Sequence, residues 1–216
     1  MKNNITELIF VIDQSGSMSG LEDDTIGGFN SMLEKQRKEE GVCHISTVFF
    51  DNSSDVIHNR RNISTVEPLT RKDYTPGGST ALLDALGDAI NHTAKVQKML
   101  ADDERAGNVV FVIITDGEEN SSHRFSSRKI KQMISHEREK YGWEFIFLGA
   151  NIDAIETADR YGIGRNRASN FACDSVGVGI NFCCVSDAVS EIRAKGCIPD
   201  GWDEDIRADY ESRGRK

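Results

Sequence analysis

The sequence is poor in the residues from which small disulfide-bonded and zinc-binding proteins are built. It has three prolines and five cysteines among 216 residues. Because the cysteine count is odd and no two cysteines have C-x-x-C spacing, the sequence predicts neither a disulfide framework nor a zinc site. We interpret the cysteines as reduced, mostly buried thiols of a cytosolic protein. They are Cys43, Cys173, Cys183, Cys184 and Cys197.

An excess of positive charge is also lacking. Lys and Arg number 26 and Asp and Glu number 35, so the net charge is −9. Non-specific nucleic-acid binding needs a basic surface, and we therefore expect no nucleic-acid partner. One local basic stretch, residues 124–131 (RFSSRKIK), is interpreted as the solvated face of a helix rather than as a docking site for an acidic partner.

Long apolar runs are absent. No run approaches the roughly 20 residues that span a bilayer. The first apolar run leads into a polar loop and not into a cleavage site, so we expect a cytoplasmic protein that does not contact membranes. The length suits one domain, assigned to residues 1–198, and a charged tail, residues 199–216, that we expect to be mobile. Trp202 is the one notable apolar residue of that tail and a candidate for docking.

Short apolar runs, by contrast, recur along the chain. Residues 8–12 (LIFVI), 108–115 (NVVFVIIT) and 144–148 (EFIFL) are typical of strands that are buried on both faces. Residues 42–50 are rich in β-branched and aromatic side chains, and a turn signal separates them from residues 55–60. This pair predicts a hairpin whose second strand lies at a sheet edge.

Amphipathic segments alternate with these runs. We expect a short strand at 168–173 and helices at 21–40, from 79 or 80 onward, at 126–141, at 152–161 and at 175–194. Alternating helices and buried strands predict an α/β fold with a doubly wound, mainly parallel sheet. Helices should cover both faces of this sheet, and the hairpin should supply one antiparallel edge strand.

A polar loop directly follows the first buried run. Residues 13–17 read DQSGS, which places Asp13, Ser15 and Ser17 two residues apart at the end of a strand. One carboxylate and two hydroxyls on one tight loop suit a small hard cation such as Mg²⁺. In the alternative interpretation, the loop is simply polar, and an Asp or Ser caps the next helix.

Two further loops offer oxygen ligands. Thr80 lies where P-G-G-S-T opens a helix, and Asp116 follows the run that ends at residue 115. Ser79 or Thr80 could also act simply as the cap of that helix. A doubly wound sheet brings such loops to one edge, where ligands bind at the carboxyl ends of the strands. Two carboxylates and three hydroxyls, with water, come close to what octahedral Mg²⁺ requires.

These motifs resemble those of the von Willebrand factor type A (VWA) domain. They are D-x-S-x-S after a buried strand, G-G-S-T-A-L at a helix start and I-T-D-G after another buried strand, and the resemblance covers about residues 7–194. It implies a metal-ion-dependent adhesion site formed by Asp13, Ser15, Ser17, Thr80 and Asp116. In such a site the three hydroxyls touch the metal, and the two carboxylates act directly or through water.

The resemblance also implies a partner. The metal would be Mg²⁺, with Mn²⁺ or Ca²⁺ as alternatives, and its open position would take an acidic residue of another protein. Residues 147–154 (FLGANIDA) and 171–182 (FACDSVGVGINF) are similar to segments of small stand-alone bacterial and phage members. The function expected from the sequence is therefore divalent-metal-dependent protein binding.

Two other functions stay open at this stage. A metal-dependent hydrolase or phosphatase would place Asp13 as its nucleophile, but Ser15 stands where aspartyl phosphatases have a second Asp. The G-x-S-x-G elbow is not matched, because Met18 occupies the nucleophile position, and the Walker A pattern is absent. We therefore expect no enzyme. The remaining alternative is a structural module whose metal site is vestigial.

Overall fold

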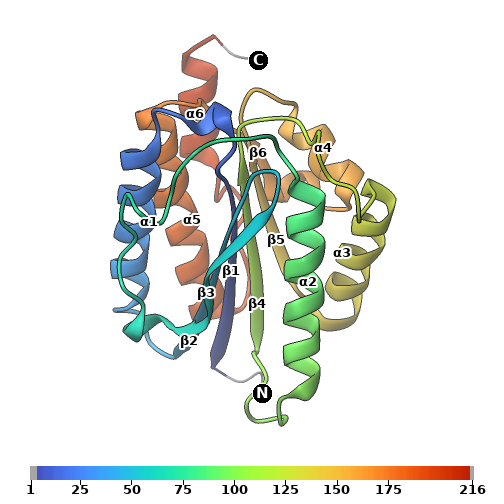
Figure 1. The fold of residues 1–216 in the computed structure, drawn as a ribbon. Coiled ribbons are helices and arrows are strands. Elements are labelled where there is room, and N and C mark those ends of the chain that lie inside the picture. Colours follow the sequence, from blue (N-terminus) through green and yellow to red (C-terminus); the bar gives the residue numbers. More distant parts are fainter. Residues whose placement is uncertain (1–3, 215–216) are drawn as a thin grey trace.

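A six-stranded β-sheet forms the centre of the computed structural model, which describes residues 4–214 (Figure 1). The strand order is β3-β2-β1-β4-β5-β6, and all neighbours are parallel except β2 and β3. This arrangement confirms the predicted mainly parallel sheet with one antiparallel edge strand. The strands are β1 (Ile5–Asp13), β2 (Val42–Phe50), β3 (Ser54–Asn62), β4 (Asn108–Thr115), β5 (Glu144–Gly149) and β6 (Ala168–Asn170).

Helices cover both faces of the sheet, as predicted. Helices α1 and α5 lie on one side, and α2 and α3 lie on the other (Figure 1). The α-helices are α1 (Glu22–Gln36), α2 (Leu82–Met99), α3 (Ser127–Tyr141), α4 (Ala154–Tyr161), α5 (Ser175–Lys195) and α6 (Glu204–Ser212). Three short 3₁₀ turns complete the fold, at Gly16–Met18, Ile63–Thr65 and Arg165–Arg167.

The central strands β1 and β4 have unbroken apolar stretches, residues 8–12 and 109–114, because both of their faces are buried there. In β1, Phe10 and Ile12 pack with α1 and α5, whereas Ile9 and Val11 pack with α2 and α3. All four side chains are almost completely inaccessible to solvent. A strand between two helical layers therefore shows a continuous apolar run, and this run rather than a polar–apolar alternation is its sequence signature.

Helix α5 is the one described helix that is long and apolar enough, by length and composition, to cross a membrane. In the fold, 56% of its most apolar window is buried. Val185, Val189 and Ile192 belong to the core on the α1 side of the sheet. This packing is that of a core helix in a globular domain. Such core helices can be as long and as apolar as helices that cross a membrane.

The prediction of a mobile tail is wrong for the residues that form α6. Residues 204–212 are helical, and Ile206 is only 2% exposed. Trp202 is buried as well, and its indole Nε1–H donates to the carbonyl oxygen of Asn166 at 3.0 Å. Two apolar side chains thus dock an otherwise charged segment on the fold. Residues 215–216 of the predicted tail lie outside the described residues.

Candidate metal centre

The candidate site lies where the winding of the sheet changes direction. Strands β1 and β4 are parallel neighbours, with Ile12 opposite Ile114. The chain continues from β1 to one side of the sheet and from β4 to the other. Asp13 ends β1 and Asp116 directly follows β4, so the two carboxylates meet at this switch point.

Asp13 is fixed by hydrogen bonds on both carboxylate oxygens. Its Oδ1 accepts from the backbone N–H of Ser15 at 2.7 Å, and its Oδ2 accepts from Thr115 Oγ1 at 2.6 Å. The buried Tyr74 hydroxyl donates to the backbone carbonyl of Asp13 at 2.6 Å. The Asp13 side chain is completely buried, and this burial, together with the nearby Asp116 carboxylate, raises the pKa of Asp13 above its ordinary value.

Ser17 connects the first loop to the second carboxylate. Its Oγ lies 3.1 Å from Ser15 Oγ and donates to Asp116 Oδ1 at 2.5 Å. The other Asp116 oxygen, Oδ2, accepts from the Cys173 thiol at 3.5 Å. Asn151, whose backbone has a positive φ of 56°, donates from Nδ2 to the Asp116 carbonyl at 3.3 Å. The loops after β1, β5 and β6 therefore all contact Asp116, which lies in the loop after β4.

Thr80 reaches the same cluster from the start of α2. A β-carbon added to Gly117 would lie 3.7 Å from Thr80 Oγ1 and 3.7 Å from Ser17 Oγ, so the two hydroxyls flank this glycine. Asn120 holds Thr80 with reciprocal hydrogen bonds. The Thr80 N–H donates to Asn120 Oδ1 at 3.0 Å, and the Asn120 N–H donates to the Thr80 carbonyl at 3.1 Å. The structure thus brings together all five residues that the sequence singles out.

The glycine-rich loop before Thr80 lies against the first loop. Gly16 donates from its backbone N–H to the Gly78 carbonyl at 3.2 Å, and Gly77 donates to the Gln14 carbonyl at 2.8 Å. Gly78 has a φ of 72°, and a β-carbon there would lie 2.8 Å from Asn52 Oδ1. Only glycine fits this position without strain, because it tolerates positive φ and leaves room for the Asn52 amide.

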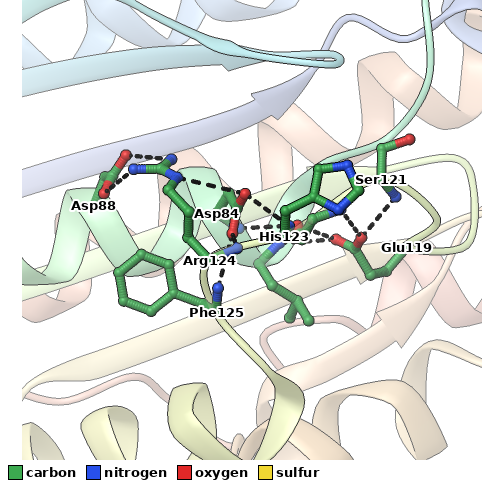
Figure 2. A network of polar contacts seen from close by, with 9 residues as sticks. Asp84, Asp88, Glu119, Ser121, His123, Arg124 and Phe125 are labelled. Carbon is green, nitrogen blue, oxygen red and sulfur yellow. Dashed lines mark hydrogen bonds and ion pairs between the residues drawn. The ribbon is translucent and has the colours of Figure 1, made fainter.

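Neither Ser79 nor Thr80 caps α2, although the sequence leaves that interpretation open. The cap position is Ala81, which makes no side-chain capping bond. Glu119 supplies the acceptor from a distant loop instead (Figure 2). Its Oε2 accepts from the Leu83 N–H at 2.9 Å, and its Oε1 accepts from the N–H groups of Ser121 and Ser122 at 2.9 and 2.7 Å.

Asp84 fastens the rest of this loop to α2. Its carboxylate accepts from three consecutive backbone N–H groups, those of His123, Arg124 and Phe125, at 2.9–3.0 Å (Figure 2). Burial opposes ionisation of Asp84, but these three bonds and the Arg124 charge outweigh it, and the pKa of Asp84 is lowered. Arg124, the first residue of the basic stretch, also forms a two-pronged ion pair with Asp88.

Sequence reasoning missed the residues that orient the cluster. Thr115 and Tyr74 stand beside the recognised motifs, directly before Asp116 and shortly before the glycine-rich loop. Their positions were therefore a usable signal. Glu119 and Cys173 offered no such signal, because they contact residues that are 36 and 57 positions away in the chain.

The donor set fits a hard divalent cation. It consists of two carboxylates and three hydroxyls, and all of them except Ser17 are buried. Within residues 4–214 no group of three or more His, Cys, Asp or Glu side chains is placed to hold a metal. A metal at this edge would therefore rely on hydroxyl and water oxygens besides the carboxylates, which suits Mg²⁺ better than metals that prefer nitrogen or sulfur.

Comparison with solved structures identifies the fold as that of VWA domains. Proximal thread matrix protein 1 from the mussel byssus aligns with a TM-score of 0.59 and 14% identity, over 88% of this chain and 47% of the other. The von Willebrand factor type A structure from Catenulispora acidiphila aligns with a TM-score of 0.59 and 12% identity, over 86% of this chain and 42% of the other. The chain thus spans less than half the length of either structure.

Two similar structures are described with a metal. Manganese-loaded TRAP protein of Plasmodium vivax has a TM-score of 0.51 and 15% identity, over 75% of this chain and 62% of the other. A second structure of the mussel protein, with a TM-score of 0.57 and 12% identity over 88% of this chain and 47% of the other, has a zinc-occupied MIDAS motif. No protein-family model and no curated protein matches the sequence. At these identities the likeness establishes the fold.

Proposed function

We propose that this protein is a divalent-metal-dependent protein-binding module. Five residues would hold the metal, namely Asp13, Ser15, Ser17, Thr80 and Asp116. The observation that carries the proposal is the convergence of their oxygen atoms at the switch point of a VWA fold, from three loops that are far apart in sequence.

The charge of the site favours an anionic partner group. Two carboxylates balance a divalent cation, and the hydroxyls add no further charge, so a bound metal keeps its attraction for another anion. Ser17 is exposed, whereas Asp13 and Asp116 are buried, so the cluster opens to solvent on the Ser17 side. A partner protein would offer an Asp or Glu carboxylate there. Mg²⁺ gives up its waters reluctantly and usually keeps several of them. Exchange of a single bound water for that carboxylate therefore suits Mg²⁺ better than complete enclosure by protein ligands.

The metal proposed is Mg²⁺, with Mn²⁺ or Ca²⁺ as alternatives. The partner is a protein and neither nucleic acid nor a membrane, in keeping with the net charge of −9. All five cysteines are free thiols, which supports a cytoplasmic location. The likeness of residues 147–154 and 171–182 to segments of small stand-alone bacterial and phage VWA domains also supports a cytoplasmic location, in a bacterial or phage-infected cell. The role proposed is binding and not catalysis.

Calorimetric titration of Mg²⁺ and Mn²⁺ into metal-stripped protein tests this proposal. Saturable binding is expected for the wild type and should disappear in Asp13→Ala. Glu118→Gln serves as the control, because Glu118 is exposed and lies in the loop after Asp116. The wild type should then retain an acidic partner in a pull-down with Mg²⁺ and release it with EDTA.

Two results would overturn the proposal. If the wild type binds neither metal, alone or with millimolar acetate as a stand-in for the partner carboxylate, the site is vestigial. If Mg²⁺-dependent turnover of a phosphate ester is abolished by Asp13→Ala, the protein is a hydrolase.

A further inference from the structure

A second cavity lies at the opposite end of the sheet from the metal-ligand cluster. It has a volume of about 370 Å³ and lies between the C-terminal ends of α2 and α3, beside Val109 at the start of β4. We call it the α2–α3 pocket. The lining residues that matter for its chemistry are Lys98, Arg105, Glu137, Tyr141 and Trp143. Its position makes it independent of the proposed metal site.

Glu137 is a buried acid without a complete set of partners. Its side chain is only 6% exposed, and among the described residues its Oε2 finds no hydrogen-bond donor. Burial raises the pKa of Glu137, while the charges of His136, Lys98 and Lys140 act in the opposite direction. An unpaired buried carboxylate oxygen is costly. Oε2 itself is enclosed by protein, but Glu137 lines the pocket, so a cationic ligand placed there can offset the cost of the buried charge.

A cationic group such as an ammonium suits the floor of the pocket. The C-terminal ends of α2 and α3 both adjoin the pocket, and helix C-termini carry partial negative charge that favours a cation. A charge-assisted bond from an ammonium to a carboxylate is also stronger than one between neutral groups. The floor of the α2–α3 pocket thus favours a positively charged nitrogen.

The rim of the α2–α3 pocket has the opposite preference. Lys98 and Arg105 are exposed there, and Arg105 is partly neutralised by its ion pair with Asp102. A ligand with only positive charge would be repelled by Lys98, whereas a ligand that also carries a carboxylate would be attracted. Trp143 and Tyr141 offer apolar surface between floor and rim for a short carbon chain.

We propose that the α2–α3 pocket binds a small zwitterion of the amino-acid type. The ammonium group lies against the Glu137 side chain, the carboxylate lies toward Lys98, and the carbon chain packs against Trp143. Nothing in this proposal depends on a metal at Asp13, so each of the two functions can fail without the other.

Binding of four probes to the full chain, measured by calorimetry and by amide NMR shifts, tests the proposal. The probes are 5-aminopentanoate, L-norvaline, pentylamine and pentanoate. At least one of the two zwitterions should bind about tenfold more tightly than pentylamine or pentanoate, because only a zwitterion meets both the floor and the rim. The comparison of 5-aminopentanoate with L-norvaline shows which charge spacing the pocket accepts.

Three variants assign the binding to particular residues. Glu137→Gln should weaken zwitterion binding about tenfold or more, since it removes the charged acceptor. Glu139→Gln, two residues away and exposed, is the matched control and should bind as the wild type does. Lys98→Ala, at an exposed site that does not threaten folding, should remove the advantage of the zwitterion over pentylamine.

Several outcomes would overturn the proposal. These are no saturable binding of either zwitterion at millimolar concentration, equal binding of pentylamine or pentanoate, and zwitterion binding that survives both Glu137→Gln and Lys98→Ala. Should Glu137→Gln fail to fold, Lys98→Ala alone decides, because a retained preference for the zwitterion contradicts the assigned role of the rim. NMR shifts confined to other parts of the protein would also contradict it.

Discussion

The backbone N–H of Leu83, in the first turn of α2, donates to Oε2 of Glu119, which lies 36 residues further along the chain, at 2.9 Å. The bond satisfies one of the free N–H groups at the start of the helix and fixes the loop that follows Asp116. That loop also carries Asn120, the partner of Thr80. Glu119 therefore holds two of the predicted metal-binding loops against each other.

Substitution of Glu119 should weaken metal binding although the residue is not a predicted ligand. In Glu119→Gln, an NH₂ group replaces one of the two carboxylate oxygens, and this group cannot accept hydrogen bonds from the backbone N–H groups that it faces. We expect metal affinity to fall about tenfold, in line with the effect of residues that orient metal ligands. Calorimetry with Mg²⁺ measures this. The neighbouring Glu118→Gln should have no effect, and equal affinities of the two variants would refute the role of Glu119.

The ionisation of Asp84 should contribute to stability above acidic pH. Hydrogen bonds from three backbone N–H groups hold the pKa of Asp84 below its ordinary value of 3.8, despite burial. A lowered folded-state pKa stabilises the fold above the unfolded pKa, and this contribution is lost as the pH falls through the folded value. The stability advantage of the wild type over Asp84→Asn should therefore be constant near pH 7 and shrink below about pH 4.

Urea unfolding of both proteins across this pH range measures the difference. Asp88→Asn is the control, since Asp88 lies one turn further along α2 and pairs with the exposed Arg124 side chain. An advantage over Asp84→Asn that is independent of pH would show that the carboxylate charge has no role in holding residues 123–125.

The sequence predicted the parts of this site whose signals are local. The buried strand runs, and the Asp and Ser residues directly after them, are adjacent in the chain, and a doubly wound sheet dictates where they meet. The contacts of Glu119 and Asp84 with partners 36 to 41 residues away have no such local signature. From the sequence alone, the Glu119 and Asp84 carboxylates could equally have been solvated surface charges. Only the folded structure shows that they accept hydrogen bonds from distant backbone N–H groups.

Tyr74 should stabilise the fold through one buried hydrogen bond. Its hydroxyl donates to the carbonyl of Asp13, at the end of β1, and the side chain is buried beside Phe49. Tyr74→Phe keeps the ring packing but leaves that carbonyl without its donor, which should cost about 1–3 kcal/mol of unfolding free energy. Chemical denaturation measures it. Tyr141→Phe, at an exposed tyrosine, should change stability little, and equal effects would contradict the assignment.

The end of the chain is ordered although its sequence predicts a mobile tail. The composition of residues 199–216 is typical of a solvated tail, and of those described, up to residue 214, only Trp202 and Ile206 belong to the core. Arg213 adds ion pairs to Asp174, at the start of α5, and to Asp209. Trp202 and Ile206 produce a weak periodic signal, because a single pair of apolar residues four positions apart is too little to establish a helix face.

Truncation of Ile206 distinguishes a docked helix from a mobile tail. Ile206 is 2% exposed in the core beneath α5, so Ile206→Ala should leave a cavity and lower the unfolding free energy by about 2–4 kcal/mol. Val176→Ala, at a position that is 58% exposed, should change it by no more than about 0.5 kcal/mol. Urea unfolding followed by circular dichroism gives both values. If Ile206→Ala unfolds at the wild-type midpoint, α6 does not contribute to the core, and the segment is a mobile tail, as its composition predicts.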